Sequence, residues 1–208
     1  MAAIATPVQQ KVILKGVSWE TYQRLLGEHQ EASGAHFIYD EGVLEIMVLS
    51  AEHEQPKRTL EILIDVLAEE LDLDVTPVGS MTFQREDRKK GLEPDSAYYI
   101  AHASVLDGRG ADPAVDPPPD LIIEVDVTSP SLPRFPIFAA FAVPEVWRYD
   151  GSRVAIHRLD GGRYVEAASS SAFPLLTAEI ATQFLEQRRS LRSTEWVRQV
   201  RAWARQQR

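Results

Sequence analysis

The chain has 208 residues, of which 44% are hydrophobic and 25% are charged, as in an ordinary globular protein. No apolar run approaches the roughly 20 residues that a membrane span requires, and the absence of cysteine excludes disulfides and thiolate metal sites. The net charge of -9 argues against a protein that coats nucleic acid non-specifically. Residues 1–10 contain neither a basic start nor a long apolar stretch, so we expect a cytoplasmic protein without a secretory signal.

The charge is unevenly distributed along the chain. Residues 188–208 carry seven arginines and one acid, Glu195, so the remaining chain carries about -15. This basic segment either approaches phosphate or forms an amphipathic helix that packs on the acidic body, and we favour the second interpretation. We therefore expect one domain over residues 11–187, followed by a basic amphipathic helix over residues 188–208. The apolar positions of that helix would be Trp196, Val200 and Trp203, and the solvated ones Arg198, Arg201 and Arg205.

The first quarter of the domain predicts a short helix and a hairpin. Ser18 precedes apolar residues at helical spacing, which indicates a capped helix. Residues 37–39 and 43–49 flank Asp40-Glu41-Gly42, whose glycine suits a turn that needs positive φ, so they indicate a β-hairpin. Glu45 lies within its second strand. The apolar residues of the helix are Trp19, Tyr22, Leu25 and Leu26.

The longest expected helix begins after Ser50. A hydroxyl residue followed by Glu52 and Glu54 is typical of a helix N-terminus. Beyond this helix, residues 75–83 indicate another strand and residues 84–91 a charged turn. The apolar face of the helix would consist of Leu60, Ile64, Leu67 and Leu71.

The second half of the chain predicts a short helix, three strands and a final capped helix. Residues 131–142 would form the short helix with Arg134 in its first turn, where Pro133 and Pro136 are tolerated. Strand-like runs joined by Asp-Gly turns then predict an antiparallel meander, and Thr177 is a candidate cap for the next helix. The three runs are residues 145–149, 153–159 and 164–167.

Acidic residues are expected to gather on two neighbouring strands near the middle of the chain. In residues 121–127, the alternation of a strand sends Glu124 and Asp126 to one face, about 6.6 Å apart. A second strand-like run, residues 94–100, carries Asp95. Three carboxylates from two strands predict an all-oxygen site for a hard cation, Mg²⁺ or Mn²⁺. The alternative is that these acids protect the edge of the sheet or form salt bridges.

Several motifs follow one another in a specific order: Gly42-Val43-Leu44-Glu45, Ser50-Ala51-Glu52-His53, Glu93-Pro94-Asp95, residues 117–125, Thr128-Ser129-Pro130-Ser131 and residues 143–150. Together they resemble the Uma family of restriction endonucleases, a branch of the PD-(D/E)XK nuclease superfamily. The likeness extends from about Trp19 to about Glu166. It implies an α/β fold with a restriction endonuclease-like core. In that core a mixed central β-sheet is flanked by helices, with the antiparallel meander and the C-terminal helices added.

The resemblance also implies a function and a set of site residues. Asp95 would be the acid of the PD motif and Glu124 the acid of the second motif, and both would bind the divalent cation. The implied activity is metal-dependent endonucleolytic hydrolysis of DNA phosphodiester bonds. In this scheme Asp126 is a third ligand or positions water, and Arg134 stabilises the phosphate. We expect DNA to be the partner and expect no association with a membrane. A homodimer is left open as an alternative to a monomer.

The sequence departs from the usual superfamily pattern at the lysine. The position two residues after the second acid is Asp126, and the position nine residues before Val143, where many members of this branch carry the lysine, is Arg134. Arginine keeps the charge but stays protonated, so it can bind a phosphate and cannot act as a general base. A catalytically weakened binding or regulatory protein with a nuclease fold is therefore the alternative. Lys89 and Lys90 are substitutes for the lysine in principle.

Two further residues depend on the resemblance. His53 begins the long helix where the family often has histidine, and it is a candidate to support the site; the other histidines show no ligand spacing. Ala142 replaces a glycine that is common before Val143, which suggests a small backbone adjustment. A third hypothesis, a structural interaction domain, would leave the three acids dispersed.

Overall fold

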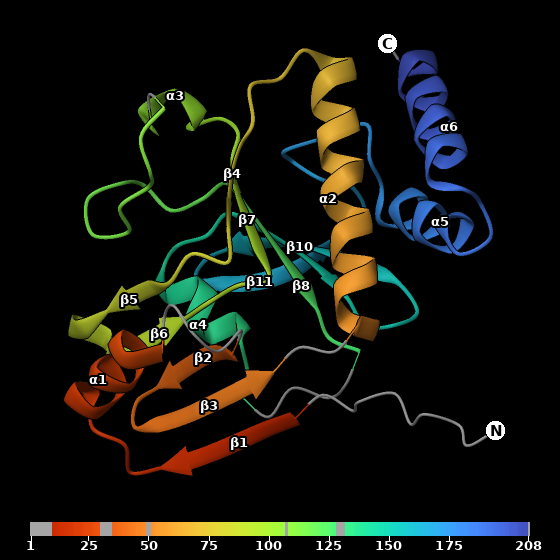
Figure 1. The fold of residues 1–208 in the computed structure, drawn as a ribbon. Coiled ribbons are helices and arrows are strands. Elements are labelled where there is room, and N and C mark those ends of the chain that lie inside the picture. The colour runs from red at the N-terminus through yellow and green to blue at the C-terminus, as the bar shows by residue number, and fades with distance from the viewer. Residues whose placement is uncertain (1–9, 30–34, 49–50, 107, 128–131, 208) are drawn as a thin grey trace, which may run out of the picture.

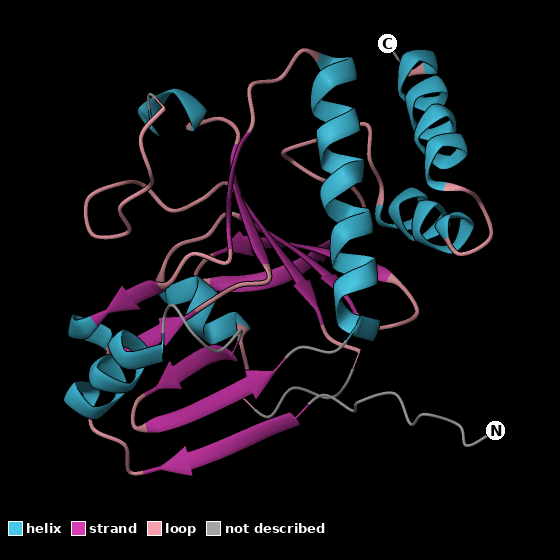
Figure 2. Cartoon of the chain, in the orientation of Figure 1, coloured by secondary structure: helices cyan, strands magenta, loops and turns pink. Residues whose placement is uncertain are grey.

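A computed structural model describes residues 10–29, 35–48, 51–106, 108–127 and 132–207, which form two β-sheets and their covering helices (Figures 1 and 2). The larger sheet has six strands in the order β11-β10-β9-β8-β7-β4. Its pairs are antiparallel except β8 and β9, so the sheet is mixed, as predicted. Its strands are β4 (Thr76–Gly79), β7 (Ser96–Tyr99), β8 (Leu121–Val125), β9 (Glu145–Tyr149), β10 (Val154–Asp160) and β11 (Arg163–Ala167).

The smaller sheet has five antiparallel strands in the order β1-β3-β2-β6-β5. The predicted hairpin forms its centre, and the turn places Glu41 and Gly42 at φ angles of 47° and 94°, where the glycine has no steric penalty. Helix α1 (Trp19–His29) covers one face of this sheet through an aromatic cluster. The strands are β1 (Gln10–Lys15), β2 (Ala35–Asp40), β3 (Val43–Val48), β5 (Phe83–Arg85) and β6 (Lys90–Leu92).

Three helices lie together on one face of the six-stranded sheet (Figure 1). They are α2 (Ala51–Leu71), α5 (Ala178–Arg188) and α6 (Ser193–Gln206). The side chain of Thr177 accepts a hydrogen bond from the backbone of Ile180 and so caps α5, as predicted. This face of the sheet and the three helices form the largest hydrophobic core of the described residues.

Helix α6 packs on the body of the protein, as the favoured interpretation predicted. Trp196 and Val200 are fully buried, and the indole of Trp196 donates to the carbonyl of Phe184. Arg201 and Arg205 are not simply solvated, because they form ion pairs with Glu69 and Glu70 near the end of α2.

The space between the two sheets contains a second hydrophobic cluster and helix α4 (Phe135–Ala140). Strand β8 contributes to both cores: Leu121, Ile123 and Val125 face α2, whereas Ile122 faces the second sheet. The predicted alternation along this strand is therefore confirmed. Glu124 has the same parity as Ile122, so it faces the space between the sheets.

Three predictions about the elements were inaccurate. Residues 75–83 are not one strand, because β4 and β5 belong to different sheets and the chain crosses between them. Helix α4 begins after Arg134, which is its N-cap residue and not part of its first turn. The charged turn holds a 3₁₀ helix, Glu86–Arg88, and the first residues of β6. Short helix α3 (Ala103–Leu106) and strand β1 were not predicted, while Ser50 and residues 128–131 lie outside the described residues.

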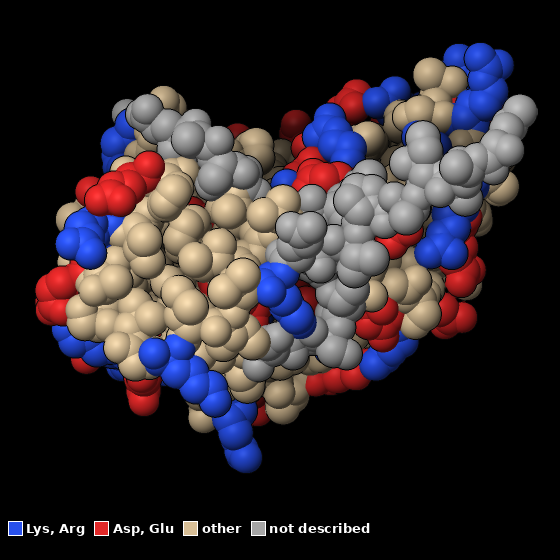
Figure 3. Space-filling model, turned by 60° about the horizontal axis from the view of Figure 1, so that its bottom comes forward, with Lys and Arg blue, Asp and Glu red and all other residues tan. Residues whose placement is uncertain are grey.

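No helix among the described residues is long and apolar enough to cross a membrane. The side of the molecule that carries β1 and β3 comes forward in Figure 3, where uncharged side chains cover a broad area with charged ones around it. Val12, Ile13, Leu14 and Val48 are the large apolar residues exposed on these two strands.

Candidate functional site

The acidic residues singled out in the sequence lie where β7 and β8 are adjacent. Ser96 pairs with Ile123 in antiparallel register, so one further step along this register leads to Asp95 and Glu124. Both side chains are buried, each with 1% exposure. Asp126 follows β8 and is largely buried. Because opposite residues of an antiparallel pair share a face of the sheet, this register brings Asp95 next to Glu124.

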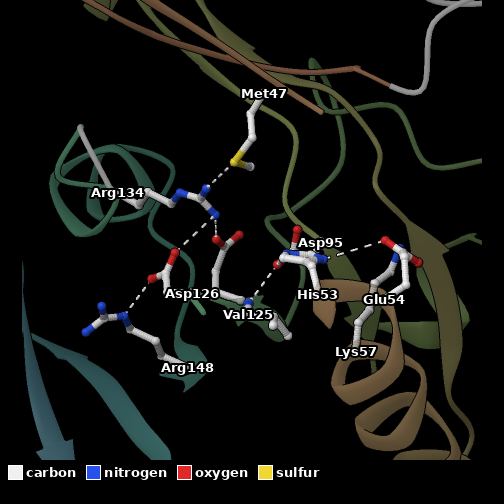
Figure 4. Close-up of polar contacts among 10 residues, drawn as sticks. Met47, His53, Glu54, Lys57, Asp95, Val125, Asp126, Arg134 and Arg148 are labelled. Atoms are coloured by element: carbon white, nitrogen blue, oxygen red, sulfur yellow. Dashed lines mark hydrogen bonds and ion pairs between the residues drawn. The ribbon is translucent and has the colours of Figure 1, made fainter. Parts of the chain in front are cut away.

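Asp95 is held by two contacts from different elements (Figure 4). Its Oδ2 accepts a hydrogen bond of 2.7 Å from the backbone N–H of Val125, and Nε2 of His53 lies 2.9 Å from the same oxygen. His53 is fully buried in the first turn of α2. Burial disfavours the charged form of Asp95, but His53, Arg134 and the Val125 N–H outweigh it and lower the pKa of this carboxyl below its ordinary value.

Arg134 links the second acid to the neighbouring carboxylate. Its Nη1 donates to Oε2 of Glu124 and lies 3.8 Å from Oδ1 of Asp126, so one guanidinium reaches both acids. Only 8% of Arg134 is exposed. Burial lowers the pKa of this guanidinium, while Asp95 and Glu45 act in the opposite direction. Arginine nevertheless remains charged in proteins, so Arg134 is a buried cation among carboxylates.

Arg148 is a second arginine of the site that the sequence analysis did not identify. It lies on β9, and the parallel register pairs it with Glu124 on β8. Its Nε donates to Oδ2 of Asp126 at 2.6 Å, and its side chain is 34% exposed. Burial raises the pKa of Asp126, and Arg148 partly opposes this shift. Only the pairing of β8 with β9 reveals this residue, and the local sequence carries no signal for that pairing.

The smaller sheet contributes the opposite wall of the site. Leu44 and Ile46 of β3 pack beneath α1, so the alternation of the strand turns Glu45 and Met47 toward the six-stranded sheet. Nη2 of Arg134 lies 3.7 Å from the sulfur of Met47 (Figure 4). Glu45 is fully buried. The site therefore lies between the two sheets, with Arg134 in contact with both.

The donor atoms of this cluster were compared with the requirements of a hard cation. Oδ1 of Asp95 and Oε1 of Glu124 are buried oxygens without a hydrogen-bond partner, and buried carboxylate oxygens are what Mg²⁺ and Mn²⁺ prefer. These residues therefore fit such an ion in donor type. Within the described part of the chain, however, no three His, Asp or Glu side chains already form a group that could hold a metal. Arg134 instead supplies the positive charge next to Glu124.

A cavity of about 260 Å³ opens beside Glu124 and Asp126. Arg134 and Arg148 contribute the positive charges of its wall, Glu124 and Asp126 contribute the acidic groups, and the rest is apolar. The apolar part consists of Pro133, Phe135, Pro136 and Phe138. A space of this kind, with two guanidinium groups and two carboxylates, suits a phosphate group whose charge is shared with a cation.

Lys89 and Lys90, the predicted substitutes for the lysine of the superfamily pattern, form contacts outside this site. Lys90 pairs with Asp40 and Glu41, and Lys89 lies 3.5 Å from Glu86 and over the ring of Trp19. They line a larger hollow of about 790 Å³ next to α1, whose lining includes neither Asp95 nor Glu124.

A family model described as "Putative restriction endonuclease", Uma2, matches residues 19–191. The chain belongs to the Uma2 family. The match covers both sheets except β1 and includes all of the acidic residues described above. No curated protein matches the chain.

The Uma2 motifs predicted from the sequence have distinct structural roles. Asp95 and Glu124 belong to the cluster between the sheets, whereas Glu145 in the segment Val-Pro-Glu has a different environment. Its buried carboxylate accepts hydrogen bonds from Trp147, Ser170 and Ser171, and so fixes the chain after β11. Ala142, where the resemblance led us to expect a glycine, adopts a φ of 58°, in the left-handed region.

Proposed function

We propose that this protein is a divalent-metal-dependent endonuclease that hydrolyses phosphodiester bonds of DNA in the cytoplasm. The observation that carries the proposal is the pair of buried, unpartnered carboxylate oxygens on Asp95 and Glu124, next to two arginines in a Uma2 chain. Such oxygens are costly to bury unless a proton or a cation compensates them. A polyanionic substrate and a divalent cation together account for both charge types in the site.

In this proposal Asp95, Glu124 and Asp126 hold Mg²⁺ or Mn²⁺. When bound, the cation lowers the pKa of a water molecule and neutralises charge that develops on the phosphate. His53 orients the carboxylate of Asp95 through the contact at Oδ2 and leaves Oδ1 for the cation. The N–H of Val125 fixes the same oxygen from the strand, so the direction of Oδ1 is set by rigid elements.

Arg134 and Arg148 act on the substrate. Arg134 pairs with Glu124, and a phosphate in the adjacent cavity would offer its guanidinium a second anionic partner. Arg148 binds Asp126 through Nε and lines the adjacent cavity, so its terminal nitrogens would be the groups that donate to substrate. Neither arginine accepts a proton at neutral pH, so deprotonation of the attacking water falls to a carboxylate or to solvent.

The second candidate function is a nuclease-derived DNA-binding or regulatory protein without turnover. The observation that favours it is the Arg134–Glu124 ion pair, because this contact occupies one oxygen of a proposed metal ligand with a cation that cannot dissociate a proton. Such a protein would retain the arginine-lined cavity for phosphate and lose the cation.

Nicking of supercoiled plasmid separates the two functions. We expect the wild-type protein to nick DNA with Mn²⁺ or Mg²⁺ and to stop when EDTA is added, and we expect Glu124→Gln to be inactive. DNA binding without nicking, over a full range of both metals, would support the second function. Nicking that persists in Glu124→Gln would contradict the proposed role of this residue.

We also propose that two copies associate through the side that carries β1 and β3. Strand β1 is at the edge of its sheet, and Val12, Ile13 and Leu14 are between 40% and 56% exposed. Exposed apolar clusters on strands are typical of association surfaces. Light scattering of the wild type and of Ile13→Lys tests this: we expect a dimer for the first and a monomer for the second, and equal masses would reject this surface.

A further inference from the structure

Glu45 is a buried carboxylate that the proposed function does not use. It lies in the middle of β3, is fully buried, and neither of its oxygens has a hydrogen-bond partner. Among the described residues it is the only carboxylate whose two oxygens are both buried and both lack a hydrogen-bond partner. Glu145 provides a contrast, because it is equally buried but accepts hydrogen bonds from Ser170, Ser171 and Trp147. The packing thus satisfies one buried glutamate and leaves the other free.

The environment of Glu45 identifies the site to which it belongs. Glu45 and Met47 share the inner face of β3, and Met47 contacts the guanidinium of Arg134. The negative charge of Glu45 acts on that same guanidinium, together with the charge of Asp95. Arg134 in turn pairs with Glu124 on the other sheet. The guanidinium of Arg134 therefore contacts the face of β3 that carries Glu45 and pairs with a carboxylate of the other sheet.

The balance of charge in this region is negative. Counted formally, Glu45, Asp95, Glu124 and Asp126 contribute four acidic groups, against the two guanidinium groups of Arg134 and Arg148. Burying an unpaired carboxylate opposes folding, so a buried acid without partners is a feature that stability alone does not explain. An excess of two negative charges is what a single divalent cation neutralises.

We propose that Glu45 is a further acidic residue of this site, and that it binds the divalent cation together with Asp95 and Glu124. This inference rests on the proposed function. Glu45 and Glu124 would hold the cation, which would supply positive charge beside them, and the guanidinium of Arg134 would then be available to a phosphate in the adjacent cavity.

The test compares Glu45→Gln with Glu145→Gln, a matched substitution at the buried glutamate that is fully hydrogen-bonded. Thermal unfolding is measured in EDTA, and Mn²⁺ binding is measured by calorimetry without DNA. We expect Glu45→Gln to unfold at the same or a higher temperature than wild type, because it removes an unpaired buried charge. We expect its Mn²⁺ affinity to fall about tenfold or more. Glu145→Gln should unfold at a lower temperature and keep its Mn²⁺ affinity.

Glu45→Asp is the second variant, since it keeps the charge and should retain part of the Mn²⁺ affinity even if the glutamine variant folds poorly. Equal Mn²⁺ affinity in wild type, Glu45→Gln and Glu45→Asp would overturn the role of Glu45 and leave the proposed metal chemistry intact. A lower unfolding temperature of Glu45→Gln with unchanged affinity would show a structural role and would also overturn it. Absence of Mn²⁺ binding in the wild type would overturn both the inference and the metal part of the proposed function.

Discussion

Arg134, the N-cap residue of α4, and Glu124, the second-to-last residue of β8, form a buried ion pair between the two sheets. Breaking a buried ion pair by removing one partner is strongly destabilising, because the other charge is left without compensation. The same pair places a permanent cation beside the proposed metal ligands. Arg134 therefore affects both the stability of the site and the entry of a metal into it.

The first prediction concerns the chemistry of Arg134. In plasmid nicking over a range of Mn²⁺ concentrations, Arg134→Lys should retain or improve cleavage, because the ammonium keeps the charge. Arg134→Ala should cleave about 100-fold more slowly, or slower still, since a charged donor to the phosphate is removed. Equal cleavage by wild type and Arg134→Ala would remove Arg134 from the mechanism. If wild type shows no cleavage and Arg134→Lys does, the protein is a weakened relative of active nucleases.

The second prediction concerns the metal. Mn²⁺ should raise the unfolding temperature of the wild type, because a ligand that binds only the folded protein stabilises it. Asp95→Asn should abolish the increase, since the amide that replaces the carboxylate carries no charge. Asp160→Asn, at an exposed position on β10, is the control and should retain the full increase. An unchanged increase in Asp95→Asn would exclude Asp95 as a ligand.

Elements with strong local patterns were predictable from the sequence. The cap at Thr177, the hairpin around Gly42 and the apolar face of α2 follow from neighbouring residues, and the structure has each of them. The alternation in β8 was equally local, and it placed Glu124 on the face opposite Leu121. These predictions needed no knowledge of which strands pair.

Features that depend on pairing over long sequence distances were not predictable. The division into two sheets separates β4 from β5, although the strand-like run of residues 75–83 extends from β4 to the first residue of β5. Arg148 joins the site only because β9 pairs in parallel with β8, and the role proposed for Glu45 depends on the contact of β3 with Arg134. A polar residue at the centre of an apolar strand was the one local signal for Glu45.

The third prediction concerns the docking of α6. Trp196 is fully buried against α5, so Trp196→Ala should lower the free energy of unfolding by about 3–5 kcal/mol. Arg198 lies on the exposed face of the same helix. Arg198→Ala should therefore change the free energy of unfolding by less than about 0.5 kcal/mol. Urea unfolding of the three proteins measures both values. A small effect of Trp196→Ala would show that α6 contributes little to the stability of the fold.

The fourth prediction concerns the backbone at Ala142. A residue with a Cβ atom pays about 1–2 kcal/mol to adopt left-handed φ, and Ala142 has a φ of 58° between α4 and β9. Glycine adopts this conformation without that penalty but loses more conformational entropy on folding, about 0.4–1 kcal/mol. Ala142→Gly should therefore increase the free energy of unfolding by up to about 1 kcal/mol, as measured by urea unfolding. Ala140→Gly is the control, because Ala140 is helical and the same substitution there should destabilise. A loss of stability in both variants would show that the turn at Ala142 tolerates alanine without strain.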